Sequence, residues 1–169
     1  MAGTNSERTL IAEGPAIILV HPQLGENIGM VARAMANFGL AELRLVNPRD
    51  GWPSEKAISA ASKADHVIEA AKVYPSLEAA VADLEFVYAT TARDRYGYKE
   101  VRSPVVAADD LRGRFRAGEK TGILFGRERT GLTNEEIALA DELVTFPVNP
   151  AFASLNLAQA VLLMSYEWM

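Results

Sequence analysis

Three clusters of polar and backbone-permissive residues stand beside apolar segments of this sequence. They cover residues 25–33, residues 125–132, and residues 146–150 with 154–156. Each cluster combines glycine or proline with side chains that can bind or polarise a ligand. A packed core does not need such residues at the ends of strands, whereas ligand sites do. Together the clusters predict a ligand site in an α/β protein.

A glycine-rich turn between a strand and a helix is a common site for phosphates and nucleotides. The second cluster nearly fits the P-loop pattern, but Leu132 stands where that pattern needs a lysine for the β- and γ-phosphates. The first cluster has only Gly25 and Gly29, so it does not fit the dinucleotide fingerprint. An ordinary doubly wound nucleotide-binding protein stays open as an alternative.

Asn27 and Arg33 lie six residues apart in a segment with helical periodicity. On a continuous helix this spacing puts the two side chains on different faces. They converge only if Asn27 stands at the helix entrance, outside the regular turns. Taken alone, the pair is typical of a capping asparagine and a surface arginine.

The other candidates also have structural explanations when each is taken alone. Glu128 lies between two arginines, which is typical of an exposed ion-pair cluster. Ser154 and Asn156 precede an apolar helix, where both residue types serve as caps. His21 and His66 have no carboxylate or second histidine at ligand spacing, so they predict no metal site.

The elements that would position these residues alternate between strand and helix patterns, which predicts an α/β domain with a largely parallel sheet. Strands are expected over residues 16–20, 42–46, 86–90, 121–125 and 143–146. Helices are expected over residues 27–38, 107–115 and 155–168, with a mostly helical stretch over 53–84 and a long loop over 91–104. Gly39 is placed to end the first helix, Thr133 and Glu136 form a capping box, and Asp109 and Asp110 are expected near a helix N-terminus.

The chain has 169 residues, which suits one domain over residues 15–169 after a disordered or extended leader over 1–14. It has no cysteine, so it has no disulfide framework, and this fits a reducing cytoplasm. No segment near the polar N-terminus reads as a signal peptide or membrane span. The net charge is −5, yet residues 93–129 carry 10 basic and 6 acidic residues, a local +4 that suits phosphate contact.

The order of the three clusters is more specific than any one of them. Asn-x5-Arg opens the first helix, Gly-x-Glu-x-x-Gly-Leu follows a later strand, and Asn-Pro with Ser-Leu-Asn precedes the last helix. This arrangement resembles the ribose 2′-O-methyltransferases of the SPOUT superfamily, in the TrmH/TrmJ branch. It is most similar to the TrmJ group, the tRNA cytidine/uridine-32 methyltransferases, over nearly the whole chain.

The resemblance implies a mostly parallel sheet flanked by helices, with a C-terminal trefoil knot that holds S-adenosylmethionine. It implies no metal. By position, the cofactor-binding residues would be Thr90, Thr91, Ala92, Gly126, Phe146, Ala153, Ser154 and Leu155.

The implied chemistry is methyl transfer to a ribose 2′-hydroxyl, at position 32 of the tRNA anticodon loop. Arg33 would be the catalytic arginine. Because arginine is effectively never deprotonated, we expect it to bind the adjacent RNA phosphate and stabilise charge on the 2′-oxygen. Asn27 would orient Arg33 or the ribose, and Glu128 would fix its loop and help hold the arginine. Ser154 and Asn156 would complete the polar pocket.

The resemblance also implies a tRNA partner and a homodimer whose active site lies at or near the subunit interface, with no membrane contact. We expect the RNA backbone to contact a basic loop formed by Arg93, Arg95, Lys99 and Arg102. TrmJ-type proteins usually continue into a C-terminal extension that assists tRNA binding, and we expect that this chain lacks it. A non-catalytic RNA-binding or assembly module on the same fold is the alternative function.

Overall fold

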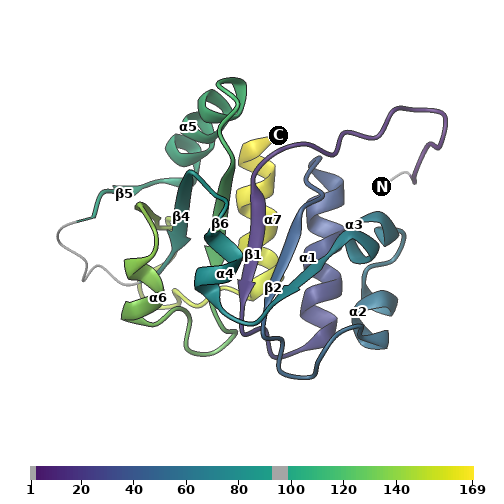
Figure 1. Cartoon of the computed structure of the whole chain (residues 1–169), viewed down its shortest axis with the longest axis horizontal. Coiled ribbons are helices and arrows are strands. Elements are labelled where there is room, and N and C mark those ends of the chain that lie inside the picture. Colours follow the sequence, from purple (N-terminus) through teal and green to yellow (C-terminus); the bar gives the residue numbers. More distant parts are fainter. Residues whose placement is uncertain (1–2, 93–98) are drawn as a thin grey trace.

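A parallel sheet forms the centre of the molecule in the computed structural model, which describes residues 3–92 and 99–169 (Figure 1). Within this described part, the sheet order is β3-β2-β1-β6-β4-β7-β5, and every pairing between named strands is parallel. The predicted α/β class with a mostly parallel sheet is confirmed. The strands are β1 (Ala16–Val20), β2 (Leu43–Val46), β3 (Lys72–Tyr74), β4 (Phe86–Thr90), β5 (Val101–Arg102), β6 (Thr121–Phe125) and β7 (Glu142–Val144).

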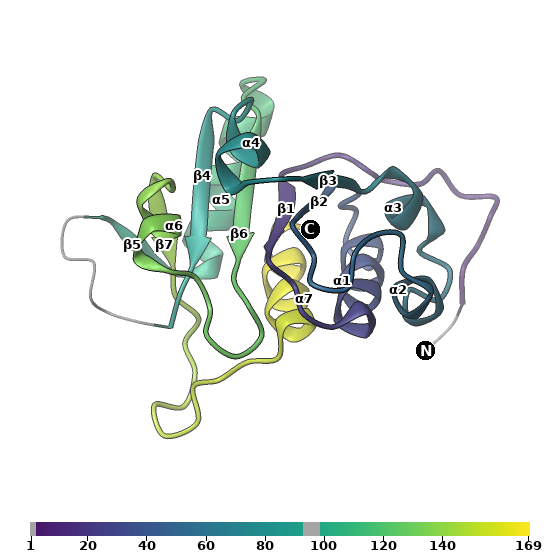
Figure 2. The ribbon, with the colours of Figure 1, turned by 60° about the horizontal axis from the view of Figure 1, so that its bottom comes forward.

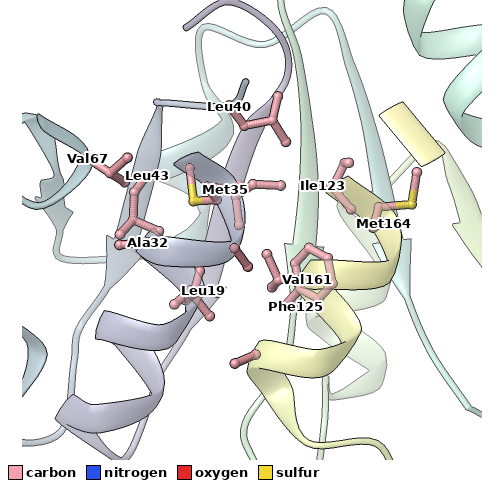
Figure 3. Packing of buried hydrophobic residues seen from close by; sticks show 14 of the residues in the cluster. Leu19, Ala32, Met35, Leu40, Leu43, Val67, Ile123, Phe125, Val161 and Met164 are labelled. Carbon is pink, nitrogen blue, oxygen red and sulfur yellow. The ribbon is translucent and has the colours of Figure 1, made fainter. Parts of the chain in front are cut away.

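Helices cover both faces of this sheet, and the alternation of side chains along each strand divides the core between them. In β1, Ile17 and Leu19 join the core beneath α1, α5 and α7, which Figure 3 shows from close by. Ile18 and Val20 join the second core, beneath α4 and α6. The helices are α1 (Gly25–Asn37), α2 (Glu55–Ala60), α3 (Asp65–Ala70), α4 (Leu77–Val81), α5 (Pro104–Arg116), α6 (Asn134–Ala138) and α7 (Leu157–Trp168).

Most expected elements are confirmed, and the differences have local causes. The strands over residues 16–20, 86–90 and 121–125 have the predicted bounds. The expected loop over 91–104 contains β5, and the mostly helical stretch over 53–84 contains β3 between short helices. Both strands are too short to show a pattern, and only pairing with a neighbour reveals them. Residues 3–15 contain neither helix nor strand, and the proposed division of the chain at residue 15 stays a prediction.

The ends of the helices follow capping rules. Gly39 has φ +76°, as expected for the residue that ends α1. Thr133 and Glu136 form the predicted capping box of α6. One expectation was wrong: α5 begins at Pro104 because Ser103 caps it, so Asp109 and Asp110 lie beyond its first turn.

The path of the chain after β6 brings distant segments together. It passes through α6 to β7, which pairs with β4 and β5 on one side of the sheet. Residues 145–156 then extend outward and return, and Figure 2 shows this yellow-green segment leading back to α7. Helix α7 packs against α1 and α5. The segments on either side of β7 therefore meet beside the ends of β4 and β6.

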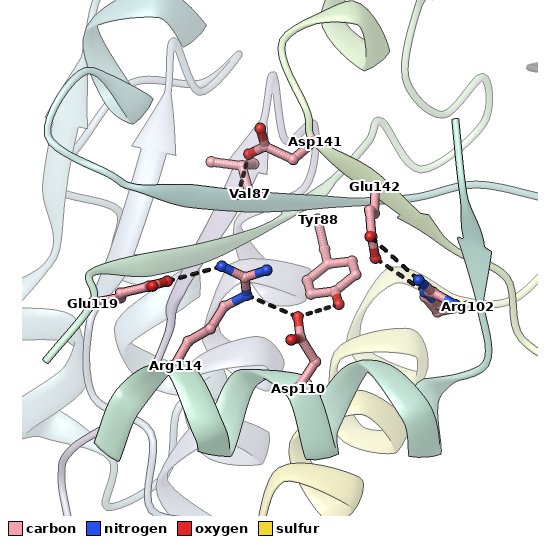
Figure 4. A network of polar contacts seen from close by, with 8 residues as sticks. All are labelled: Val87, Tyr88, Arg102, Asp110, Arg114, Glu119, Asp141 and Glu142. Atoms are coloured by element: carbon pink, nitrogen blue, oxygen red, sulfur yellow. Dashed lines mark hydrogen bonds and ion pairs between the residues drawn. The ribbon is translucent and has the colours of Figure 1, made fainter. Parts of the chain in front are cut away.

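A polar network fixes α5 to the sheet (Figure 4). The Tyr88 hydroxyl donates to Asp110 Oδ2 at 2.5 Å, and Arg114 Nε donates to the same oxygen at 2.9 Å. Arg114 also lies over the ring of Phe86, 3.5 Å from its centroid. The network anchors β4, the strand whose far end reaches the candidate site. No helix among the described residues is long and apolar enough to cross a membrane.

Candidate active site

A cavity of about 360 Å³ lies where β4, β6 and β7 end. These parallel strands are neighbours, so their carboxyl ends share one edge of the sheet. The volume falls within the usual range for small-molecule sites. The structure places all eight residues predicted to bind the cofactor on its wall: Thr90, Thr91, Ala92, Gly126, Phe146, Ala153, Ser154 and Leu155.

The wall of the cavity combines apolar side chains with backbone groups. The hydroxyl of Thr90 donates a hydrogen bond to Leu124 O at 2.8 Å, and the hydroxyl of Thr145 donates one to Thr91 O at 3.3 Å. The backbone N–H groups of Phe146, Ser154 and Leu155 make no hydrogen bond with any described residue. These donors are free for a ligand. Apolar contact comes from Phe125, Leu132, Phe146, Val148 and Leu157.

The loop between β6 and α6 folds tightly over this cavity. Arg127 and Gly131 exchange backbone hydrogen bonds of 3.3 and 3.0 Å. A Cβ on Gly126 would lie 2.3 Å from the carbonyl carbon of Gly131, so only glycine fits there. Leu132 is buried in the core, so its position differs from the exposed lysine of a P-loop. This agrees with the sequence argument against an NTPase.

Glu128 connects this loop to the entrance of α1. Its carboxylate accepts hydrogen bonds from Gln23 N at 3.0 Å, Leu24 N at 2.8 Å and Asn27 Nδ2 at 3.2 Å. The simple reading of Glu128 as part of an exposed ion-pair cluster is therefore wrong. Charge-assisted bonds of this kind are stronger than neutral ones, so the carboxylate fixes two segments that lie far apart in sequence.

Arg127 pairs with a different acid. Its Nη1 and Nη2 lie 2.8 and 3.0 Å from the two carboxylate oxygens of Glu136, and Nη1 also donates to Gly131 O. Burial raises the pKa of Glu136, while hydrogen bonds from Arg127 and from the backbone of Thr133 lower it, and the net direction is downward. The ion pair therefore holds the loop onto the start of α6.

Asn27 and Arg33 do not converge within the chain. Asn27 lies inside the first turn of α1, so the condition for their convergence is not met, and Leu24 is the N-cap residue instead. Asn27 is buried and contacts Glu128. Arg33 is exposed and makes no hydrogen bond or ion pair within residues 3–92 and 99–169. It does not line the cavity.

Ser154 and Asn156 have different places. Ser154 lines the cavity. Asn156 caps α7, because its Oδ1 accepts from Ala158 N at 2.9 Å and Gln159 N at 3.3 Å. This matches the capping explanation drawn from sequence for Asn156, which does not line the cavity.

Comparison with known proteins now adds to this geometry. Residues 14–166 match the SpoU rRNA Methylase family. The chain belongs to this family. It is 40% identical over 151 residues to the uncharacterized tRNA/rRNA methyltransferase LasT of Escherichia coli K12, covering 89% of this chain and 66% of that protein.

Two TrmJ proteins are also similar to this SpoU family chain. The tRNA (cytidine/uridine/adenosine-2′-O-)-methyltransferase TrmJ of Pseudomonas aeruginosa UCBPP-PA14 is 39% identical over 151 residues, covering 89% of this chain and 58% of that protein. The crystal structure of TrmJ from Z. mobilis ZM4 superposes with a TM-score of 0.85 at 57% identity, covering 91% of this chain and 68% of that one. The chain thus spans about 58–66% of the length of these curated relatives.

The basic loop predicted to bind RNA is described only in part in this member of the SpoU family. Arg93 and Arg95 lie outside the described residues. Lys99 Nζ donates to Ala140 O at 2.5 Å, and Arg102 Nε pairs with Glu142 at 3.1 Å. Both described cations already have partners on the chain, so their contact with RNA stays a prediction.

Sequence reasoning missed several parts of the site. Thr145 and Val148 line the cavity, and Gln23 supplies a backbone N–H to Glu128. Thr145 and Gln23 lie within two residues of a recognised cluster, so extending the clusters would have found them, whereas Val148 lies inside the third cluster and was given no role. Among the described residues, no three His, Cys, Asp or Glu side chains gather to hold a metal ion.

Proposed function

We propose that this chain carries the catalytic part of an S-adenosylmethionine-dependent methyltransferase that acts on a ribose 2′-hydroxyl of tRNA. The single observation that carries the proposal is that the second and third sequence clusters line one cavity in a member of the SpoU methylase family, where Glu128 on the cavity wall binds Asn27 of the first cluster. The TrmJ relatives are named for 2′-O-methylation of tRNA nucleosides. Position 32 of the anticodon loop is the substrate that the TrmJ resemblance suggests.

The residues around the cavity fit the cofactor. S-adenosylmethionine has an apolar-faced adenine with polar edges, a ribose and a charged amino acid group. Phe125, Leu132 and Val148 can enclose the ring, and the free N–H groups of Phe146, Ser154 and Leu155 can bind its polar edge. When bound, the cofactor supplies a methyl group activated by a positively charged sulfur.

The chain's own residues must then orient the ribose and stabilise its oxygen. A 2′-hydroxyl is a poor nucleophile, and its proton must pass to solvent water as the new carbon–oxygen bond forms. The guanidinium of Arg33 binds the neighbouring phosphate and stabilises negative charge on the 2′-oxygen. Ser154 orients a substrate oxygen from the cavity wall. Glu128 and Asn27 hold the entrance of α1 in place.

We propose that a second copy of the chain completes the site. Arg33 lies six residues after Asn27, which is about 9 Å along the helix and about 120° around it. Within one chain it therefore stands away from the cavity and faces solvent. A homodimer could bring Arg33 of one copy to the cavity of the other. The exposed apolar residues of neighbouring α7 support this arrangement.

The C-terminal trefoil knot is part of the same proposal. Two loops, over residues 126–132 and 145–156, meet at the cavity, and α7 follows the second loop into the space beside α1. This path supports a threaded loop that encloses the cofactor. A tRNA substrate would place the protein in the cytoplasm, in keeping with the absence of cysteine.

Calorimetric titration with S-adenosylmethionine, with ATP as the control ligand, tests the cofactor. We expect S-adenosylmethionine alone to bind. In a tRNA methylation assay, Arg33→Ala should lower the rate about 10²–10³-fold without changing cofactor affinity. Arg116→Ala, which removes an exposed arginine from the end of α5, should have no effect. A folded protein that does not bind S-adenosylmethionine would contradict the proposal and favour a non-catalytic RNA-binding module.

A further inference from the structure

A second hollow, of about 390 Å³, lies at the C-terminal ends of β1 and β2. It shares a wall with the candidate active site, because Arg127 lines both. Gln23 also joins them, since its N–H donates to Glu128 on the wall of the active-site cavity. The second hollow is lined by His21, Gln23, Asn47, Pro48, Arg49 and Arg127.

Two of its residues adopt an unusual backbone conformation. His21 has φ +50° and Asn47 has φ +44°, and each directly follows its strand. Because β1 and β2 are paired neighbours, the two side chains meet, with Asn47 Nδ2 3.5 Å from His21 Nδ1. The left-handed region is unfavourable for residues with a Cβ, although Asn and His adopt it more often than most. Such strain gathers at ligand sites, where it aims polar side chains.

The hollow also has an available positive charge. Arg49 is exposed and pairs with Asp50, its sequence neighbour, through contacts of 3.1 and 3.3 Å. Both side chains of this pair are 55% exposed, so the ion pair contributes little to stability, and Arg49 can leave Asp50 for another anion. A phosphate can accept a bidentate pair of hydrogen bonds from the guanidinium. The Arg49 backbone N–H donates to Pro22 O at 3.0 Å. This bond fixes Arg49 beside Gln23, whose own N–H binds Glu128.

We propose that the second hollow binds the ribose-phosphate backbone of the RNA that flanks the methylated nucleotide. Arg49 contacts a phosphate, and Asn47 and His21 donate hydrogen bonds to phosphate or ribose oxygens. RNA fits better than a small anion because the hollow measures about 390 Å³ and shares Arg127 with the wall of the candidate active site. This inference rests on the proposed tRNA methyltransferase function.

The test is tRNA binding measured over a range of salt concentrations. Arg49→Ala should weaken binding about tenfold, and the slope of log K against log salt should fall by about 0.7 for one lost phosphate contact on a single strand. Asp50→Asn should do the opposite and tighten binding about two- to threefold, because it removes the acid that competes with phosphate. Arg116→Ala is the charge-matched control, because Arg116 lies at the end of α5 that leads to the start of β6, at the opposite edge of the sheet.

The variant Asn47→Gly distinguishes the role of the Asn47 side chain in RNA binding from its effect on the stability of the fold. Glycine adopts positive φ without strain, so this variant should keep or raise the thermal midpoint. We expect it to weaken tRNA binding about threefold without changing the salt slope, because no charge is lost.

Calorimetry with S-adenosylmethionine on every variant keeps the two proposals distinguishable. We expect cofactor affinity to stay unchanged. If wild-type protein binds the cofactor and methylates tRNA, but Arg49→Ala behaves like Arg116→Ala, the second hollow is no RNA site and the proposed function stands. If wild-type protein binds neither the cofactor nor tRNA, both proposals are wrong.

Discussion

At the scale of single residues, Glu128 accepts hydrogen bonds at the N-terminus of α1, where a capping side chain would usually lie. Leu24 precedes α1 and has no side chain able to cap it. Glu128, more than a hundred positions later in the chain, binds the N–H groups of Gln23 and Leu24. A carboxylate at this end also suits the positive end of the helix dipole. A residue that lines the candidate active site therefore also fixes the helix that carries Arg33.

Arg44 is the other residue whose surroundings matter at this scale. It is buried in the sheet on β2, where its guanidinium binds Asp83 at 2.6 and 2.9 Å and Ala80 O at 2.7 Å. Hydrogen bonding from Arg44 lowers the pKa of Asp83 below its ordinary 3.8, against the opposite effect of burial. The buried cation thus depends on ionised partners at the surface, which are Asp83 and also Glu42 at 3.2 Å.

Asp83→Asn should lower the free energy of unfolding by about 1–3 kcal/mol at pH 7, because it weakens the partner of a buried charge. Since the pKa of Asp83 is lowered in the folded state, its contribution is present above pH 4 and is lost as the pH falls through the folded pKa. Urea unfolding of wild-type and variant protein at pH 7 and at pH 3 measures the stability loss and its dependence on pH. Asp109→Asn, at an 85% exposed side chain, should change neither, and an equal loss at the two pH values would contradict this account.

At the scale of elements, close packing between α1 and α2 depends on Gly29. A Cβ at this position would lie 2.2 Å from Ala57 O and 2.7 Å from Ala60 Cβ. The two helices approach each other through backbone, which is why α2 can lie so near. Gly113 in α5 differs, because a Cβ there would meet nothing within 4 Å.

The same substitution should therefore have opposite effects at these two positions. Gly29→Ala should destabilise the fold by about 1–3 kcal/mol, because the backbone of α2 must move. Gly113→Ala should stabilise it by about 0.5–1 kcal/mol, because alanine loses less conformational entropy in a helix. Thermal unfolding of both variants checks this, with a lower midpoint expected for Gly29→Ala and a higher midpoint for Gly113→Ala. Equal shifts in one direction would mean that helix propensity, not packing, decides the stability at both sites.

At the scale of the whole molecule, one side of α7 remains uncovered in a single chain. Leu162, Leu163, Tyr166 and Met169 are exposed there, next to the helix that carries Arg33. Tyr166 packs edge-on against Phe38, just after α1, with ring centroids 5.7 Å apart. An apolar surface of this kind suits the proposed homodimer.

Leu163→Glu should convert the dimer to a monomer in sedimentation velocity, because it places a charge in the proposed interface. Methylation should fall with dimerisation, since Arg33 would no longer reach a cavity. Ile58→Glu, at a similarly exposed position on α2, should leave both unchanged. A monomeric Leu163→Glu protein with full activity would show that one chain supplies the whole site.

The sequence by itself determined most of the strands and the parallel sheet, because apolar runs are local signals. The cofactor residues came from the family resemblance and stay a proposal. The sequence could not determine β3 or β5, which become strands only by pairing with β2 and β7. Nor could it choose between the two explanations of Glu128 and Asn156. Only the tertiary structure decided that Glu128 binds the entrance of α1 while Asn156 caps its own helix. The reason is physical: both residue types can make either contact, and the choice depends on which donors the fold brings within reach.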